Sequence, residues 1–262
     1  MDDPRRHPFR DSRQDAEVAR HLPETPQTRA PAYRIAFTDT DFLMRDELRP
    51  VRLQLELLKP QLVMDECGVE TTVVIMGSAR LRPGQGPLAG WYNVACDLAR
   101  RVTERSLASY GRDWVVVTGG GPGIMEAGNR GAAEAGGQSI GLNIVLPHEQ
   151  APNPWVTPDL CFNFHYFAIR KMHFLMRARA ICIFPGGFGT LDEMFESLTL
   201  IQTGRMRRVP ILLFGKDFWG SVINWQALVE AGTISPEDLD IFRHVETAEE
   251  AMAILDAWDH GC

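Results

Sequence analysis

The feature that most constrains the fold is a repeated alternation of short apolar runs with helical patterns. Six runs are rich in β-branched or aromatic residues, as strands are. They are apolar nearly throughout rather than at every second position, which is typical of strands buried on both faces of a sheet. Such strand–helix alternation predicts a parallel, doubly wound sheet. The predicted strands lie at residues 71–76, 114–118, 139–144, 160–164, 180–184 and 210–214, and the predicted helices at 88–109, 122–136, 166–178, 190–203 and 218–231.

The predicted class is therefore α/β: a Rossmann-like, mostly parallel sheet with helices on both faces and an N-terminal helical extension. The segment 145–158 holds four prolines, from Pro147 to Pro158, and is expected to be an irregular loop. Ligands bind such sheets beyond the carboxyl ends of the strands, at the point where the strand order reverses. The loops that follow the strands are accordingly the places where a site is expected.

The two ends of the chain carry different patterns. Residues 1–38 contain five prolines and no apolar periodicity, which indicates an extended arm. Residues 39–66 repeat apolar side chains at helical spacing, which predicts one or two amphipathic helices, the second opened by Pro50. A last helix, at 247–258, begins with a capping box. We expect an arm over residues 1–38 and a single domain over 39–262.

Composition excludes several classes of protein. The formal net charge of -7 argues against binding to nucleic acid. The five cysteines are scattered, with no C-x-x-C pair, which argues against a disulfide framework or a zinc site and fits a reducing cytosol. No run approaches the roughly 20 apolar residues that span a bilayer, and the first 20 residues lack the apolar core of a secretory signal. We expect a cytoplasmic protein with no bound metal and no membrane partner.

A first glycine-rich turn, residues 119–123, follows the second predicted strand. Glycines at such a turn let backbone N–H groups approach an anion closely. The dinucleotide fingerprint G-x-G-x-x-G fits at no register, because Ile124 or Glu126 stands where its third glycine belongs. A dinucleotide-dependent oxidoreductase is therefore disfavoured. Close packing of a strand against a helix explains the same glycines, and both interpretations stay open.

A second glycine-rich turn, Pro185 to Thr190, follows the fifth predicted strand and opens a helix. Its glycines, its hydroxyl and the helix N-terminus offer N–H groups and partial positive charge to a phosphate. The competing interpretation is a capping box in which Glu193 accepts from the Thr190 N–H. Asp192 and Glu193 would repel a phosphate if they did nothing else. A catalytic role for these carboxylates is therefore worth considering.

The helix predicted before this turn supplies positive charge. Arg170, His173 and Arg177 share one face of the segment 166–178, which is otherwise largely apolar. An arginine on such a helix needs a partner, either a structural carboxylate or a ligand, and the sequence does not choose between them. His165 and His173 lie near the turn, and both are interpreted as ordinary surface or packed histidines.

These motifs together resemble a known signature. Arg170-Lys171 followed by the run Pro185–Glu193 is similar to the R-K…P-G-G-x-G-T-x-x-E pattern of the LONELY GUY (LOG) family, cytokinin riboside 5′-monophosphate phosphoribohydrolases long labelled lysine decarboxylases. The similarity covers about residues 70–245. The resemblance implies that Arg170 and Glu193 are catalytic. It further implies substrate or phosphate binding by Lys171, Gly186, Gly187, Phe188, Gly189, Thr190, Asp192, Gly77, Ser78, Gly120, Gly121 and Met125.

The function implied by the resemblance is cleavage of the bond between base and ribose in a nucleoside 5′-monophosphate. The N-terminal extension resembles the longer bacterial branch, whose members often act on AMP, so AMP and cytokinin riboside monophosphates are the expected substrates. No cofactor is expected. The protein is expected to form a homodimer or a higher homo-oligomer. Arg170 is expected to hold the phosphate and to lower the pKa of Glu193. Asp192 departs from the family, whose plant members usually carry Glu there, so its role in holding ribose or base is in doubt.

Two other functions can be weighed against this one. A lysine decarboxylase needs a Schiff-base lysine, and this chain has only Lys59, Lys171 and Lys216, of which Lys171 belongs to a motif with another role. A non-catalytic carrier of a nucleotide or of the molybdenum cofactor on the same scaffold is the stronger rival. Such a carrier keeps the glycine turns but has no need of the Arg170/Glu193 pair.

Overall fold

The computed structural model describes residues 9–146 and 151–258. Pro147 of the predicted loop and Cys262 lie outside the described residues. The chain divides into two compact units, residues 1–55 and 56–262, rather than after residue 38 as the sequence suggested. None of the helices within the described residues is long and apolar enough to cross a membrane.

The first unit is more helical than an extended arm. Helix α1 (Ser12–Arg20) begins at Asp11, whose side chain accepts from the backbone N–H groups of Arg13 and Gln14 at 2.7 and 2.9 Å. No residue of α1 is buried, so local capping rather than an apolar stripe specifies it. That is why apolar periodicity gave no sign of it. The unit also contains η1 (Pro31–Tyr33), η2 (Ala36–Thr38), α2 (Thr40–Leu43) and η3 (Asp46–Leu48).

Helix α3 (Arg49–Glu66) contributes to both units, and this places the boundary inside a continuous helix. In its first turns, Arg52 Nη1 donates to the carbonyl oxygens of Leu43 and Arg45, both at 2.7 Å. In its second half, Met64 is buried in the core of the second unit. The first turns of α3 therefore make contacts within the first unit and its second half belongs to the core of the second.

The second unit is built on a seven-stranded parallel sheet with the order β4-β3-β2-β1-β5-β6-β7. The central strand β1 is buried at every residue, as its apolar run predicted. The predicted α/β class and doubly wound sheet are confirmed. The strands are β1 (Thr72–Met76), β2 (Val115–Thr118), β3 (Ser139–Ile144), β4 (Cys161–Phe164), β5 (Ala178–Ile183), β6 (Ile211–Phe214) and β7 (Phe242–Val245).

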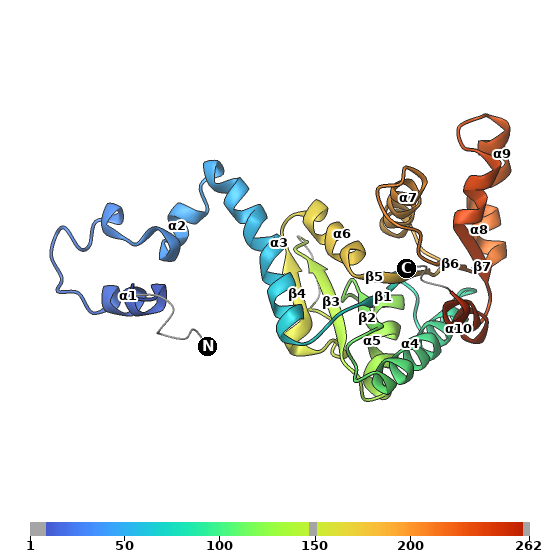
Figure 1. The fold of residues 1–262 in the computed structure, drawn as a ribbon, viewed down its shortest axis with the longest axis horizontal. Coiled ribbons are helices and arrows are strands. Elements are labelled where there is room, and N and C mark those ends of the chain that lie inside the picture. The colour runs from blue at the N-terminus through green and yellow to red at the C-terminus, as the bar shows by residue number, and fades with distance from the viewer. Residues whose placement is uncertain (1–8, 147–150, 259–262) are drawn as a thin grey trace. The chain divides into compact units, whose positions relative to one another are not determined.

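Helices cover both faces of this sheet (Figure 1). Alternate residues of β1 point to opposite faces, so Val73 belongs to one apolar core and Val74 to the other. The core around Val73 is closed by α4 (Gly90–Ala108), α5 (Ile124–Glu134) and α10 (Ala248–Ala257). The core around Val74 is closed by the second half of α3 and by α6 (Phe167–Met176), α7 (Phe188–Gln202) and α8 (Lys216–Val222).

Three details differ from the sequence prediction. Strand β7 was not predicted, because only Phe242 and Val245 of its four residues are buried and the run is not continuously apolar. The helix predicted at 218–231 is two, α8 and α9 (Trp225–Glu230), because the Asn224 side chain accepts from Ala227 N and starts a new helix. Short η4 (Pro158–Leu160) and η5 (Pro236–Ile241) occupy connections. Of the capping box predicted for the last helix, the Thr247 cap is confirmed, since Thr247 Oγ1 accepts from Glu250 N at 3.1 Å, but the Glu250 carboxylate accepts from Glu246 N at 2.7 Å rather than from Thr247 N.

Gly131 allows the close packing of α4 on α5, and its replacement tests that packing. A Cβ at this position would overlap the backbone carbonyl oxygen of Cys96 and lie 2.9 Å from the Ala99 Cβ. We expect Gly131→Ala to destabilise the protein by about 1–3 kcal/mol, because the helices must move apart. Gly220 of α8 faces open space, so Gly220→Ala should leave stability unchanged or raise it slightly. Equal melting temperatures for the two variants would contradict this packing.

Candidate active site

A cavity of about 840 Å³ opens at the carboxyl ends of the central strands. It lies where the connections diverge, from β1 towards β2 on one side and from β5 towards β6 on the other. Doubly wound sheets bind ligands at this switch point. The lining residues are Ile75, Met76, Gly77, Ser78, Ala79, Arg80, Gly119, Met125, Phe167, Arg170, Phe174, Gly186, Gly187, Phe188, Gly189, Thr190, Leu191, Asp192, Glu193 and Val222.

The turn after β1 joins two other elements of the site. Ser78 N donates to the carbonyl oxygen of Pro185 at 3.0 Å, which ties this turn to the segment that leads into α7. The carbonyl oxygen of Ser78 accepts from Ile124 N at 3.1 Å, which ties the same turn to the start of α5. A Cβ on Gly77 would lie 2.8 Å from Ile124, so only glycine fits there. Three turns that are far apart in the sequence therefore meet around the cavity.

Helix α7 presents its N-terminus to the cavity. The helix starts at Phe188 with Gly187 as its N-cap, and Leu191 N is bonded to the Gly187 carbonyl at 2.9 Å. The N–H groups of residues 188–190 precede the first intrahelical bond and carry the positive end of the helix dipole. The capping-box alternative is wrong, because Thr190 lies inside the helix and is not its N-cap. A Cβ on Gly186 would overlap the Thr190 side chain, which explains this glycine.

Glu193 is a buried carboxylate on the wall of the cavity. Its side chain lies on the first turns of α7 and the residue is 8% exposed. Burial raises the pKa of Glu193 to about 7, against the lowering effect of the positive charges of Lys171 and Arg170, while the charges of Glu196 and Asp192 raise it further. Arg170 therefore does act in the expected direction, but burial outweighs it. A carboxyl group with a pKa near neutrality can gain or lose a proton at physiological pH.

Arg170 reaches the cavity from α6 and is held on several sides. Its Nε donates to the Leu142 carbonyl at 2.7 Å, and its guanidinium carbon lies 5.2 Å from the centre of the Phe174 ring. A Cβ on Gly119 would lie 2.6 Å from Nη2, so the first glycine of the turn after β2 makes room for the guanidinium. A backbone carbonyl and an aromatic face thus fix Arg170 beside the cavity.

The other polar residues of α6 have structural contacts. Arg177 donates to Asp65 at 2.7 Å and to backbone carbonyls of Gln61 and Val69. His173 is buried, lies 3.2 Å from the Glu56 carbonyl oxygen through Nε2 and packs on Phe164, and burial lowers its pKa. The interpretation of His173 as a packed histidine is confirmed.

Three of the predicted binding residues do not line the cavity. Lys171 Nζ instead bridges two carboxylates of α7, Asp192 at 3.0 Å and Glu196 at 2.9 Å. The carbonyl oxygens of Gly120 and Gly121 accept from the Asn153 side chain, both at 3.0 Å. The Gly120 N–H donates to Thr118 Oγ1 at 3.0 Å, so these contacts hold the turn in place.

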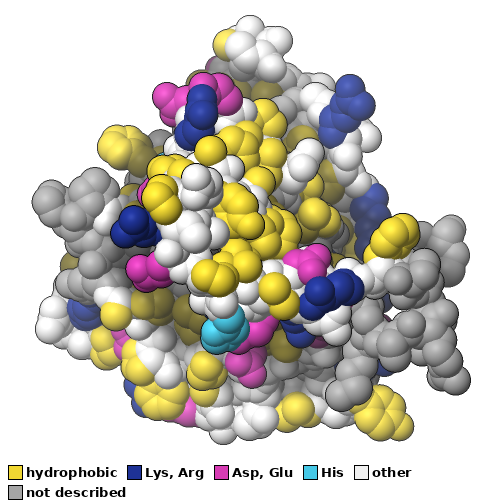
Figure 2. All heavy atoms as spheres, turned by 90° about the vertical axis from the view of Figure 1, so that its left-hand side faces the viewer, with side chains coloured by type: hydrophobic (Ala, Val, Ile, Leu, Met, Phe, Trp, Pro, Cys, Tyr) yellow, Lys and Arg dark blue, Asp and Glu magenta, His cyan; other side chains and the backbone are white. Residues whose placement is uncertain are grey.

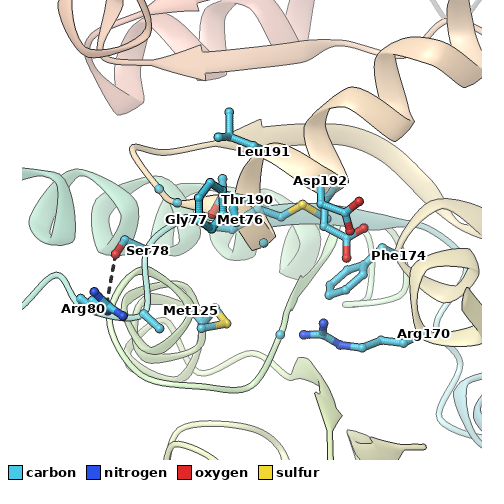
Figure 3. Close-up of a pocket in the computed structure, with 18 of the residues that line it drawn as sticks. Met76, Gly77, Ser78, Arg80, Met125, Arg170, Phe174, Thr190, Leu191 and Asp192 are labelled. Atoms are coloured by element: carbon cyan, nitrogen blue, oxygen red, sulfur yellow. Dashed lines mark hydrogen bonds between the residues drawn. The ribbon is translucent and has the colours of Figure 1, made fainter. Parts of the chain in front are cut away.

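The cavity also contains residues that the motif did not include. Gly119, Phe167 and Phe174 line it beside Arg170, and Arg80 lines it from the turn after β1 (Figure 3). The sequence carried a signal for Arg80, because it follows a predicted strand end by four residues. The two phenylalanines could not be distinguished from core residues, since both sit in an apolar helix.

The fold and this cavity define a doubly wound α/β protein whose cavity, at the switch point of its sheet, is bordered by a helix N-terminus, a buried glutamate and two arginines. A family model described as "Possible lysine decarboxylase" matches residues 125–255, half of the chain. The protein belongs to this family, the LOG family, and the resemblance carried by the Arg170 and Glu193 motifs is confirmed.

Curated relatives carry a more specific name. The chain is 26% identical over 178 residues to the cytokinin riboside 5′-monophosphate phosphoribohydrolase LOG3 of Arabidopsis thaliana, which covers 66% of this chain and 78% of the relative. It is 28% identical over 166 residues to the cytokinin riboside 5′-monophosphate phosphoribohydrolase of Mycobacterium tuberculosis, covering 60% and 84%. The X-ray structure of TM1055 matches with a TM-score of 0.51 and 21% identity, over 72% of this chain and 99% of that one. The structural match supports the shared fold.

Proposed function

We propose that this protein hydrolyses the N-glycosidic bond of a nucleoside 5′-monophosphate, AMP or a cytokinin riboside monophosphate, and releases the free base and ribose 5-phosphate. The observation that carries the proposal is the position of Glu193: a buried carboxyl group with a pKa of about 7, on the cavity wall, one turn inside a helix whose N-terminus faces the same cavity. The names of the LOG-family relatives support the same reaction.

The start of α7 provides the anchor for the substrate. N–H groups of residues 188–190 and the hydroxyl of Thr190 surround a space that a phosphate can fill. Anchoring the phosphate there fixes the ribose near Glu193, so binding energy far from the reacting bond orients the reacting atoms. Phe167, Phe174 and Met125 supply apolar surface against which a base can pack.

The reaction needs a carboxylate near the sugar. As the bond between C1′ and the base nitrogen lengthens, positive charge builds on the ribose, as it does in glycoside hydrolysis. Ionised Glu193 stabilises this charge and accepts a proton from the water whose oxygen bonds to C1′, while the departing base takes up a proton. Arg170, held by Leu142 and Phe174, keeps a positive charge beside Glu193.

A direct assay tests the proposal. The protein is incubated with AMP, CMP, GMP and isopentenyladenosine monophosphate, and the products are separated by chromatography. Free base and ribose 5-phosphate are expected from AMP or the cytokinin nucleotide. Tight binding of a nucleotide without any release of base would instead identify a non-catalytic carrier.

The lysine decarboxylase description is not supported by the site. Schiff-base chemistry needs a lysine amine that faces the bound cofactor. None of Lys59, Lys171 and Lys216 lines the described cavity, and Lys171 is engaged by two carboxylates with its pKa raised by them. We propose that the protein does not release cadaverine from lysine in the presence of pyridoxal phosphate.

We also propose that the protein is a homodimer or a larger homo-oligomer. Large apolar side chains near the site are exposed on α6 (Phe167, Met176) and on α7 (Phe188, 92% exposed). Figure 2 shows one face of the molecule on which many hydrophobic side chains are exposed, with charged side chains among and around them. Apolar patches of this kind are typical of protein interfaces. Light scattering coupled to gel filtration should give at least twice the chain mass of 29.4 kDa, and a monomer would contradict the proposal.

A further inference from the structure

Arg80 is a cationic side chain of the cavity with no part in the reaction derived above. It stands on the turn after β1, and its backbone N–H donates to Ser78 Oγ at 3.1 Å, which fixes the course of the turn. The residue is exposed, so its guanidinium is in contact with solvent at the cavity. Figure 3 shows Arg80 and Ser78 on one side of the cavity and Arg170 with Phe174 on the other. Two arginines therefore line the cavity from opposite sides.

The start of α7 adjoins the side on which Arg80 stands. Ser78, two residues before Arg80, donates through its backbone to Pro185, the residue before Gly186. The turn that carries Arg80 is thus tied to the segment that leads into α7, and Arg80 lines the same cavity as the start of that helix. Helix N–H groups and a guanidinium are both donors suited to the oxygens of a phosphate, and the guanidinium can form two parallel hydrogen bonds with it.

The opposite side of the cavity is suited to the reacting bond. Arg170 lies close enough to Glu193 for its charge to lower the carboxyl pKa, and its Nε and ring contacts hold it in place. A phosphate bound against Arg170 would bring its own negative charge next to Glu193, which is already crowded by Asp192 and Glu196. Repulsion of this kind favours the phosphate at the far side.

We propose that Arg80 binds the 5′-phosphate of the substrate together with the start of α7, and that Arg170 serves the sugar and base instead. This rests on the proposed function and orients the substrate: phosphate towards Arg80 and Ser78, glycosidic bond towards Glu193. Arg80 then makes the enzyme select phosphorylated over unphosphorylated nucleosides. It replaces the expectation that Arg170 holds the phosphate.

Arg82 provides a matched control in the same loop. Its Nη1 donates to the carbonyl oxygens of Ala79 and Leu81 at 2.7 and 3.2 Å, and the residue does not line the cavity. Removing Arg82 takes the same charge from the loop without removing a group that faces the cavity. A difference between the two variants therefore reports on the position of the charge rather than on net charge.

The experiment compares wild type, Arg80→Ala, Arg80→Lys and Arg82→Ala. Calorimetry measures binding of ribose 5-phosphate, and steady-state assays measure cleavage of AMP and of adenosine. Arg80→Ala should weaken ribose 5-phosphate binding and raise KM for AMP by about tenfold to a hundredfold, the usual effect of losing a charge-assisted hydrogen bond. Its kcat for AMP and its activity on adenosine should stay near wild type. For Arg80→Lys, the affinity for ribose 5-phosphate and the KM for AMP should lie between those of wild type and Arg80→Ala. For Arg82→Ala, both should match wild type.

Several results would overturn the phosphate contact: wild-type affinity for ribose 5-phosphate in Arg80→Ala, equal losses in Arg80→Ala and Arg82→Ala, an equal loss on AMP and adenosine, or no binding of ribose 5-phosphate to wild type. Failure of the proposed function looks different. A wild-type protein that binds ribose 5-phosphate through Arg80 but cleaves no nucleotide would refute the hydrolase and leave the phosphate contact standing.

Discussion

Replacing Glu193 with glutamine is expected to slow cleavage of AMP by roughly 10²-fold or more, because the amide can neither take a proton from water nor balance charge on the ribose. The fold should persist, since glutamine has nearly the same size and a buried neutral group is cheaper than a buried carboxylate. Nucleotide binding should also persist, because we propose that the start of α7, not Glu193, holds the phosphate. The measurement is release of adenine, with binding of AMP followed by calorimetry.

Glu196→Gln is the matched control for this variant. Glu196 lies one turn further along α7, pairs with Lys171 and does not line the cavity. Its replacement should leave kcat within a few-fold of wild type at pH values well above 7. Near wild-type release of adenine by Glu193→Gln would refute Glu193 as the catalytic carboxylate and with it the assigned reaction.

The pH dependence of the wild type follows from the same group. Since burial raises the pKa of Glu193 to about 7, the ionised form that the reaction needs is depleted in acid. We expect kcat/KM to rise tenfold per pH unit below about 7 and to level off above it. Loss of this acid limb in Glu193→Gln, within its residual activity, would assign the limb to Glu193. A wild-type profile flat from pH 5 to 8 would contradict the assignment.

Stability should vary with pH in the opposite sense. The pKa of Glu193 is higher in the folded protein than its ordinary value of 4.5, so the folded state binds the proton more tightly. This contribution to stability is complete below about pH 4.5 and is lost as the pH rises through 7. The Glu193→Gln variant has no proton to lose at this position, so its stability does not fall in this way as the pH rises. Its melting temperature should exceed that of wild type above pH 7, and the difference should shrink towards pH 5.

Replacing Arg170 with lysine is expected to lower kcat/KM for AMP by roughly 10²-fold, as removal of a preorganised donor at a reacting centre does. Lysine has no Nε–H to bond the Leu142 carbonyl and no planar group to lie on Phe174. The lysine side chain would therefore keep the positive charge, but nothing would hold that charge where the guanidinium of Arg170 lies. The measurement is steady-state kinetics alongside thermal unfolding, which separates lost turnover from lost fold.

Arg177→Lys gives the contrast on the same helix. Arg177 binds Asp65 and carbonyls of α3 and Val69, away from the cavity. We expect this variant to lose melting temperature and to keep the turnover of its folded fraction. If Arg170→Lys behaved in the same way, with a lower melting temperature and unchanged kcat/KM, Arg170 would be a structural residue only.

Local patterns in the sequence were sufficient for most of the fold. The run Thr72–Met76 is buried at every residue, as its apolar character predicted. The glycine turn before α7 could be recognised from its glycines and its place after a predicted strand. Elements without such a pattern were not predicted. Helix α1 is specified by the Asp11 cap, and β7 combines buried Phe242 with exposed Arg243. Polar caps and edge strands depend on contacts that apolar periodicity does not register.

The candidate site was predictable in part for the same reason. Arg170, Glu193 and the start of α7 belong to one recognisable spacing, and all three line one cavity. The spacing could not show whether Lys171 faces the cavity. Lys171 follows Arg170 directly in the sequence, but its side chain bridges Asp192 and Glu196 instead of lining the cavity. Nor could the spacing show that Arg80 borders the same cavity from a turn about 90 residues before Arg170.

The sequence by itself determined the doubly wound sheet and the donor-rich start of α7, because both depend on residues that are neighbours in the chain. The burial of Glu193 and the positions of the surrounding cations depend on the tertiary structure. Burial raises the carboxyl pKa, and Glu193 is buried in the wall of a cavity that residues far apart in the chain assemble. The bond from Ser78 N to Pro185 O ties the turn that carries Arg80 to the segment that leads into α7. Such juxtapositions arise when parallel strands align their carboxyl ends at one edge of a sheet.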